Sequence, residues 1–136
     1  MNAPSQIKRY KIEQTWGGNH SVTLEVDHET LTTERALEHL RFWTGADDKI
    51  SEEDGDAVRA AIRDFGVNAI YHMLADFGAD FKDEATAKRW SEKMRDMEGY
   101  GGETATPYGW LGIRIIAAEA QSPSFEEVEL KEVAQA

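Results

Sequence analysis

The stretch "IKRYKIEQTWGGNHSVTLEVD", residues 7–27, decides the fold of this chain because it predicts two strands joined by a turn. The "GGNH" near its middle, at 17–20, is a turn signal. On either side of it apolar and polar residues alternate, so each half presents one apolar face: Tyr10, Ile12 and Trp16 in the first half, and Val22, Leu24 and Val26 in the second. The stretch therefore predicts a β-hairpin whose apolar face needs cover from the rest of the chain.

Helices are predicted to supply that cover, because apolar residues after the hairpin recur every three or four positions. The predicted ranges are about 33–44, 52–77 and 84–98. In the second range the helical spacing continues through Gly66, which favours one long helix, although a glycine inside a helix costs about 1 kcal/mol relative to alanine. Two helices that meet near Gly66 are the alternative.

The C-terminal part of the chain predicts a second hairpin. After an irregular stretch at 100–109, residues 110–121 alternate, "SPS" at 122–124 turns the chain, and residues 125–133 alternate again. The order ββ-ααα-ββ predicts an α+β fold, in which an antiparallel sheet of two hairpins packs on a block of about three helices. No internal repeat or linker divides residues 1–136, so we expect a single domain.

Composition places the chain among globular proteins, and its charge restricts its partners. Hydrophobic residues make up 40% of the 136 residues, enough for a self-sufficient core. The net charge of −11 repels nucleic acid and anionic membranes, so we expect neither as a direct partner. The absence of cysteine excludes disulfides and thiolate metal sites. Because the N-terminus lacks an apolar signal segment, we expect a cytoplasmic protein.

The negative charge is concentrated in two segments. Residues 13–56 hold twelve acids against three cations, and residues 119–136 hold five acids against one lysine, whereas residues 1–12 hold three cations and no acid. We expect the two acidic segments to form one negative surface. The alternative is that the acidity only keeps the protein in solution.

The densest acidic stretch, "DDKISEEDGDAV" at 47–58, packs six carboxylates around one lysine. It fails as an EF-hand calcium loop, which needs acids at its first and twelfth positions and glycine at its sixth. With Gly55 at the sixth position, those two positions are Ile50 and Ala61.

The same stretch fits the start of a helix. Ser51 and Asp54 match a capping box, and acids in a first helical turn are favoured by the helix dipole. This explains Glu52, Glu53 and Asp54. It leaves Asp47, Asp48 and Asp56 unexplained, so these are the positions at which we look first for a partner.

No residue set in the chain fixes a reaction. The four histidines lack the i, i+4 spacing of a helical zinc site, and neither a nucleophile elbow nor a phosphate-binding loop occurs. "DHE" at 27–29 could supply a ligand or a general base, but it is also typical of a polar strand exit. We therefore expect a non-enzymatic protein without a cofactor or metal, and a small enzyme or metal-binding protein is the alternative.

Aromatic residues around the irregular stretch allow two interpretations. Tyr100, Tyr108 and Trp110 flank several glycines, a composition found both in contact loops and in lids over a core edge. Trp43, at the end of the first predicted helix, is interpreted as a core anchor.

Five segments together resemble a known family: "KRYKIEQ", "VTLEVDHETLT", "FWTGADDKI", "DGDAVRAAIRDFG" and "GIRIIAAEA". The likeness spans nearly the whole chain and is to a family of small proteins from phages and prophages of proteobacteria, a domain of unknown function. The resemblance implies a mobile-element context and no catalytic residues. Small acidic phage proteins without catalytic motifs often bind a host protein, as anti-CRISPR inhibitors do.

These observations predict an interaction protein that binds a basic surface of a host protein in the bacterial cytosol. The resemblance makes an effector subunit of a CRISPR system, or another defence complex that handles nucleic acid, the expected partner. A homodimer joined through an exposed strand edge is a further interpretation. The residues predicted to contact the partner are Asp47, Asp48, Glu52, Glu53, Asp54, Asp56, Tyr100, Tyr108, Glu126, Glu127 and Glu129.

Overall fold

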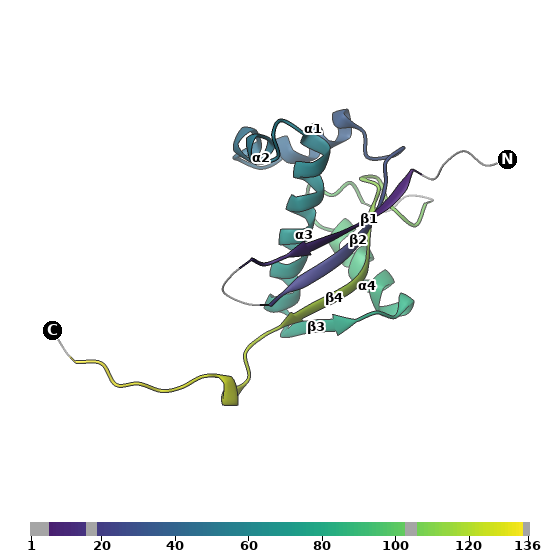
Figure 1. Cartoon of the computed structure of the whole chain (residues 1–136). Helices are drawn as coiled ribbons and strands as arrows, with labels where there is room; N and C mark the ends of the chain where they lie inside the picture. The colour runs from purple at the N-terminus through teal and green to yellow at the C-terminus, as the bar shows by residue number, and fades with distance from the viewer. Residues whose placement is uncertain (1–5, 16–18, 103–105, 135–136) are drawn as a thin grey trace.

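The computed structural model describes residues 6–15, 19–102 and 106–134, and shows one antiparallel sheet with helices on one side (Figure 1). The strands lie in the order β1-β2-β4-β3. Among the described residues, no helix combines the length and the apolar composition that a bilayer span requires. Along the chain the elements are β1 (Ile7–Glu13), β2 (Ser21–Asp27), α1 (Thr33–Arg41), α2 (Ala46–Glu52), α3 (Ala57–Ala75), β3 (Gly78–Phe81), α4 (Glu84–Arg95), β4 (Ile113–Gln121) and the short 3-10 helix η1 (Phe125–Glu127).

The N-terminal hairpin is confirmed. β1 and β2 pair antiparallel with Tyr10 opposite Leu24 and Ile12 opposite Val22, so the predicted apolar residues share one face. The three predicted residues of β2 are fully buried on that face, whereas Tyr10 and Ile12 are half-buried near the edge of the sheet. Trp16, the other predicted member of this face, lies outside the described residues.

The prediction of a second hairpin near the C-terminus is wrong. β4 forms as predicted, within 110–121, but residues 125–133 contain only η1 and otherwise neither helix nor strand. The fourth strand is instead β3, which pairs with the end of β4. Farther along the same edge of β4, Ser91 of α4 bonds both backbone groups of Ile115: its Oγ accepts from the Ile115 N–H at 2.9 Å and lies 3.4 Å from the carbonyl oxygen. Since β3 and α4 occupy this edge, a strand after β4 has no neighbour there.

The part of the chain that the structure describes contains four helices rather than the three predicted, besides η1. The long helix α3 continues unbroken through Gly66, which confirms the single-helix interpretation, but it begins at Ala57 and not near residue 52. The residues before it form the separate helix α2. α1 and α4 begin within one residue of the predicted positions and end about three residues early.

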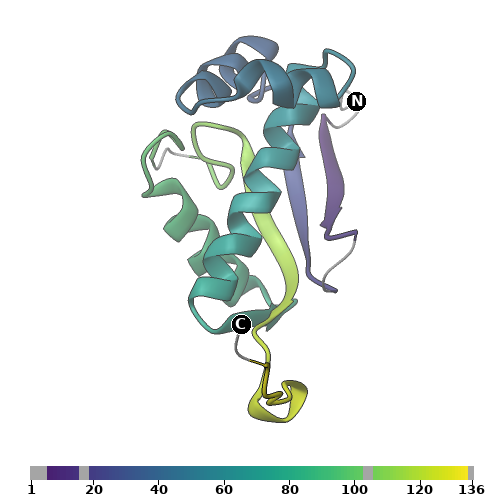
Figure 2. The same ribbon diagram turned by 90° about the vertical axis from the view of Figure 1, so that its left-hand side faces the viewer.

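The core lies between the sheet and α3, which crosses the sheet obliquely (Figure 2). Val22, Leu24, Ile113 and Ile115 from the sheet are almost fully buried, as is Phe65 of α3. α1 and α2 cover one end of α3 (Figure 1).

Gly66 sets how closely α3 approaches the edge strand β1. A Cβ atom at this position would lie 2.2 Å from Cγ1 of Ile12 and 2.8 Å from its Cγ2, which no real contact allows. The absence of a side chain at Gly66 therefore allows the helix to lie directly on β1. This explains why a helix of 19 residues contains a glycine that lowers its intrinsic stability.

We predict that Gly66→Ala lowers the free energy of unfolding by about 1–3 kcal/mol, because the added methyl group overpacks the contact with Ile12. Urea denaturation followed by circular dichroism measures this change. In the background of Ile12→Ala, which removes Cγ1 and Cγ2, the same substitution should cost less. An equal cost in both backgrounds contradicts the assigned contact.

Candidate functional site

The predicted acidic stretch folds as α2, a turn and the N-cap of α3. Ser51 lies inside α2 and does not cap a helix, so the predicted capping box is wrong. Asp54 and Gly55 turn the chain with φ angles of 56° and 88°, which ends helical structure between α2 and α3. Asp56 then caps α3, where its Oδ1 accepts from the Arg59 N–H at 3.0 Å. The stretch thus contains a helix end and a helix start.

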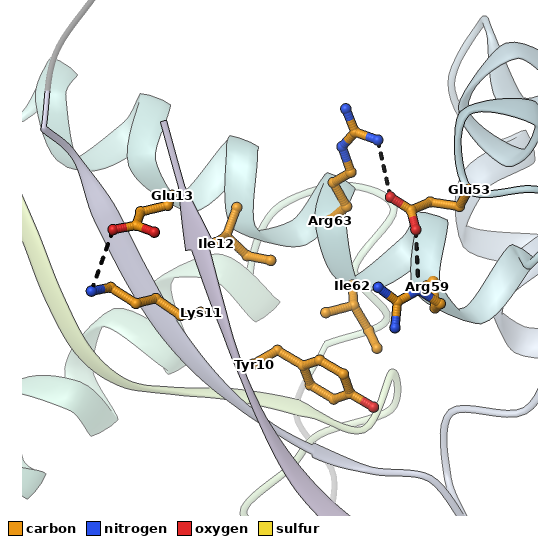
Figure 3. Close-up of a pocket in the computed structure, with 8 residues that line it drawn as sticks. All are labelled: Tyr10, Lys11, Ile12, Glu13, Glu53, Arg59, Ile62 and Arg63. Atoms are coloured by element: carbon orange, nitrogen blue, oxygen red, sulfur yellow. Dashed lines mark hydrogen bonds and ion pairs between the residues drawn. The ribbon is translucent and has the colours of Figure 1, made fainter. Parts of the chain in front are cut away.

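Glu53 is the acid of this stretch that is neutralised by neighbours. Its two carboxylate oxygens accept from Arg59 Nε at 3.1 Å and from Arg63 Nη1 at 3.0 Å (Figure 3). The hydrogen bond from Arg59 is the main reason that the pKa of the Glu53 carboxyl lies below its usual value. Glu53 therefore joins the turn after α2 to the first two turns of α3.

Four acids of the stretch point to solvent and form what we call the α2 surface: Asp47, Asp48, Glu52 and Asp54. All four are exposed, and within the described residues none of their side chains has a hydrogen bond or ion pair. Asp47 and Asp48 lie in the first turn of α2. Of the six predicted carboxylates, these four are available to a partner, whereas Glu53 and Asp56 have structural roles.

A buried carboxylate, Asp64 of α3, holds α2 in place. Lys49 of α2 donates to Asp64 Oδ1 at 2.8 Å, and Nε2 of His39 in α1 lies 3.3 Å from Oδ2. His39 Nδ1 donates to the carbonyl oxygen of Gly99 at 2.8 Å, since that oxygen can only accept. Burial raises the pKa of Asp64, but the hydrogen bonds from His39 and Lys49 outweigh it and lower the pKa below its usual value. Sequence analysis missed this cluster.

Two exposed aromatic rings follow α1. Phe42 and Trp43 are 53% and 38% exposed, and their rings pack edge to face with centroids 4.8 Å apart. They rest on Gly99, where a Cβ atom would lie 2.8 Å from Phe42 Cδ1. Trp43 is therefore not the predicted core anchor. The pair is a half-exposed apolar feature next in the chain to α2.

The two predicted contact tyrosines are largely committed to the protein interior. Tyr100 is 3% exposed and packs its ring against Phe65 and His39, with centroids 5.6 Å and 5.0 Å away. The prediction that Tyr100 lies on a contact surface is therefore wrong. Tyr108 is half-buried and its hydroxyl donates to Glu25 at 2.7 Å.

Glu25 is a nearly buried carboxylate on the sheet face opposite the helices. It forms ion pairs with arginines of both neighbouring strands. Arg9 of β1 donates to it at 3.0 Å, and Arg114 of β4 donates through Nε and Nη2 at 2.8 Å and 2.6 Å. Burial raises the pKa of Glu25, but the hydrogen bonds from Tyr108, Arg114 and Arg9 bring it below its usual value. This charge cluster stabilises the sheet and leaves no free acid for a partner.

The acids near the C-terminus lie far from α2. In both views α1 and α2 occupy one end of the molecule, and the chain after β4 leaves from the other (Figures 1 and 2). The acidic stretch at 47–56 and the acids near the C-terminus therefore do not form one surface, although Glu13, at the start of the first acidic segment, lies in register with Ser21 and Glu119 across the sheet. Glu126 and Glu129 are exposed, and Glu127 accepts from the Ser124 N–H and hydroxyl.

The "DHE" cluster is a strand exit in the structure. Asp27 accepts from the Glu29 N–H at 3.0 Å and from the Thr30 hydroxyl at 3.1 Å, and His28 Nε2 is hydrogen-bonded to the Tyr10 hydroxyl at 2.7 Å. Burial is the main cause that lowers the pKa of His28. Among the described residues, no group of three histidine, aspartate or glutamate side chains is arranged to hold a metal ion.

The fold and these surfaces define a small α+β protein in which a layer of helices covers one face of a four-stranded antiparallel sheet and unpaired acids gather on α2. The chain belongs to a family described as protein of unknown function (DUF2528), whose model matches residues 21–130. Membership of a family of unknown function is thus confirmed, and the phage origin stays a prediction. No curated protein and no solved structure matches the chain.

We predict that Asp64→Asn lowers the free energy of unfolding by about 3 kcal/mol, because it leaves the buried ring of His39 and the partly exposed ammonium of Lys49 without their anion. Urea denaturation at neutral pH measures the change. Asp76→Asn is the matched control, since its ion pair with Lys93 is exposed and should contribute less than about 1 kcal/mol. Equal effects of the two substitutions contradict the role given to Asp64.

We predict that the stability of the protein falls as the pH drops below about 4, because Glu25 and Asp64 have lowered pKa values in the folded state. Their stabilisation is complete above the unfolded-state pKa values and is lost as the pH falls through the folded-state values. Glu25→Gln should lower stability at neutral pH and flatten this acid dependence, whereas the exposed Glu119→Gln should change neither. Urea midpoints measured over a pH series test both statements.

Proposed function

We propose that this protein is a non-enzymatic interaction protein whose α2 surface binds a basic surface of another protein. The observation that carries the proposal is the division of the acidic stretch, in which four exposed carboxylates have no cation partner among the residues that the structure describes. A free carboxylate array of this kind attracts lysine and arginine side chains and steers their approach.

Contacts within the protein fix the position of α2 and of the turn after it before any partner binds. Lys49 links α2 to Asp64 at 2.8 Å, and Glu53 links the following turn to Arg59 and Arg63. Because these contacts fix α2 on α3, little backbone ordering is needed on binding. Preorganisation of this kind favours affinity.

The aromatic pair supplies the apolar part of the proposed contact. Phe42 and Trp43 are exposed in the short segment between α1 and the acidic helix, and aromatic residues are enriched among interface residues that dominate binding energy. We therefore place the contact on Phe42, Trp43 and the α2 surface. Glu126, Glu127 and Glu129 lie at the other end of the molecule and are not included.

For the partner we propose a protein with a groove that binds nucleic acid, because carboxylates at close spacing compete for the cations that contact phosphates. A subunit of a CRISPR effector, or another defence protein of a bacterial host, has this chemistry and fits the resemblance to phage proteins. The interaction would then block access of nucleic acid to that groove.

We predict that a variant with Asp47→Asn, Asp48→Asn, Glu52→Gln and Asp54→Asn loses a partner that the wild-type chain captures from a bacterial host lysate, and that salt weakens the wild-type capture. Affinity capture at two salt concentrations, with mass spectrometry, tests this. The matched control neutralises Glu29, Glu84, Glu98 and Glu119, four exposed acids outside α2, and should keep the partner. With the partner purified, Phe42→Ala should weaken binding about 30-fold, equivalent to about 2 kcal/mol. Equal loss in both charge variants contradicts the proposal.

A further inference from the structure

Within the described residues, the outer edge of β1 from Arg9 to Glu13 has no backbone partner. The hydrogen bonds from the Gln14 N–H to the His20 carbonyl and from the His28 N–H to the Gln6 carbonyl show that the backbone groups of the even-numbered residues of β1 point toward β2. Because hydrogen-bonded and non-bonded pairs alternate in an antiparallel ladder, the backbone N–H and C=O groups of Arg9, Lys11 and Glu13 point outward. Within the described residues no backbone group bonds to them, and all three residues are exposed.

The segment after β4 carries apolar residues into solvent. Phe125 is 89% exposed, Val128 60%, Leu130 96% and Val133 81%. The segment projects away from the rest of the molecule (Figure 1). Such a run of large exposed apolar side chains marks a surface that is covered by something else.

The sequences of β1 and this segment are complementary when the two are aligned in parallel. "IKRYKIE" (7–13) and "FEEVELK" (125–131) place apolar opposite apolar, or one charge opposite its counter-charge, at every position of the seven-residue strand. The pairs are Ile7–Phe125, Lys8–Glu126, Arg9–Glu127, Tyr10–Val128, Lys11–Glu129, Ile12–Leu130 and Glu13–Lys131.

We propose that residues 125–131 of one copy of this protein add to the free edge of β1 in a second copy, as a parallel fifth strand. Pairing of this kind uses backbone hydrogen bonds for affinity and alternate side chains for specificity. It goes beyond the proposed function and does not depend on it, since it is argued from the edge of β1 and from residues 125–131 and uses none of the four acids of the α2 surface.

Antiparallel pairing fits the side chains poorly. A register that aligns Tyr10 with Leu130 and Ile12 with Val128 sets Arg9 opposite Lys131 and Glu13 opposite Glu127. A shift by two residues removes these repulsions but sets Lys8 opposite Leu130 and Ile12 opposite Glu126. Like charges directly opposite each other in a sheet are destabilising.

The parallel register requires a second copy, because the segment cannot reach the start of its own β1. Ile7 pairs with Asp27, whose N–H bonds to Gly112, nine residues before the end of β4. Phe125 would have to return about 30 Å along the sheet, besides crossing β2 and β1. The four residue steps from Gln121 to Phe125 span at most about 14 Å.

A hollow beside β1 suits the apolar side chains of the incoming strand. Tyr10 and Ile12 of β1 and Ile62 of α3 line it, together with Lys11, Arg59 and Arg63 (Figure 3). Val128 and Leu130, opposite Tyr10 and Ile12, would point to this side of the sheet.

The rearrangement needed for pairing is small. η1 is a single turn with no buried residue, closed by the bonds between Ser124 and Glu127. Among the described residues, Lys11 forms an ion pair only with Glu13, at 3.5 Å, and both side chains are mostly exposed. Residues 128–131 already lie outside helices, so they can pair before η1 opens.

A charge exchange tests the pairing by light scattering behind size exclusion over a range of concentrations. We expect the wild-type chain to associate as concentration rises, and to lose this association when Lys8 and Lys11 are changed to Glu, or when Glu126 and Glu129 are changed to Lys. The two changes together should restore it. These positions avoid Arg9, which also holds Glu25.

The matched control combines Lys8→Glu and Lys11→Glu with Glu127→Lys and Glu132→Lys, which gives the same net charge at positions that do not face the two lysines. It should stay at the mass of one chain. A wild-type chain that is monomeric at every concentration overturns the proposal, as does equal restoration by both sets.

Register and copy number are tested by cross-linking, since the chain has no cysteine of its own. Lys8→Cys and Glu126→Cys, in separate chains that are mixed and oxidised, should form a mixed disulfide-linked dimer, because these two positions are opposite each other in the parallel register and not in either antiparallel register described above. Ile7→Cys mixed with Lys131→Cys should not, because these positions lie about 20 Å apart in the parallel register. Preferential cross-linking of the second pair indicates antiparallel pairing and overturns the proposed register. Absence of any mixed dimer overturns the proposed pairing of residues 125–131 with β1 of a second copy.

Discussion

The buried carboxylate of Asp64 organises the helical end of this protein. It receives Lys49 from α2 and His39 from α1, and His39 in turn binds the carbonyl of Gly99 before the loop that leads to β4. α2 has only seven residues, none of them fully buried, of which Ala46 and Ile50 pack partly against the core. The ion pair from Lys49 to Asp64 adds to this contact in holding the helix that carries the exposed acids, so the α2 surface depends in part on a charge that it does not contain.

Local patterns predicted those parts of the fold that local forces determine. Alternation in residues 7–27 predicted the β1–β2 hairpin because its two strands are neighbours in the chain and each is the other's partner. The same alternation in residues 125–133 failed, because a strand needs a free edge and β4 offers none. β3 was missed because "GADF" at 78–81 has four residues, three of which are poor strand formers.

The sequence predicted which acids gather at the candidate site, but not which of them are already ion-paired within the protein. It showed six acids together. Glu53 differs from the others because it is ion-paired with arginines six and ten residues later, across a turn that no periodicity reveals. Phe42 was missed and Trp43 was assigned to the core because the helical stripe was extended past Arg41, where α1 ends. Tyr100 was assigned to the surface because glycines surround it in the chain, whereas its ring is buried against Phe65.

The uneven charge of the chain has a physical consequence for its two proposed contacts. An edge strand with lysine and arginine resists pairing with another copy of itself, since the cations repel, yet accepts an acidic strand. Two copies with a net charge of −11 repel each other at long range, but at physiological ionic strength this repulsion is screened beyond about 8 Å, whereas paired strands lie only about 4.8 Å apart. Moderate salt thus removes a barrier to the contact between copies. It has the opposite effect on the α2 surface, where attraction of a basic partner over a distance is the source of binding. Added salt should therefore strengthen the contact between copies and weaken the contact at the α2 surface.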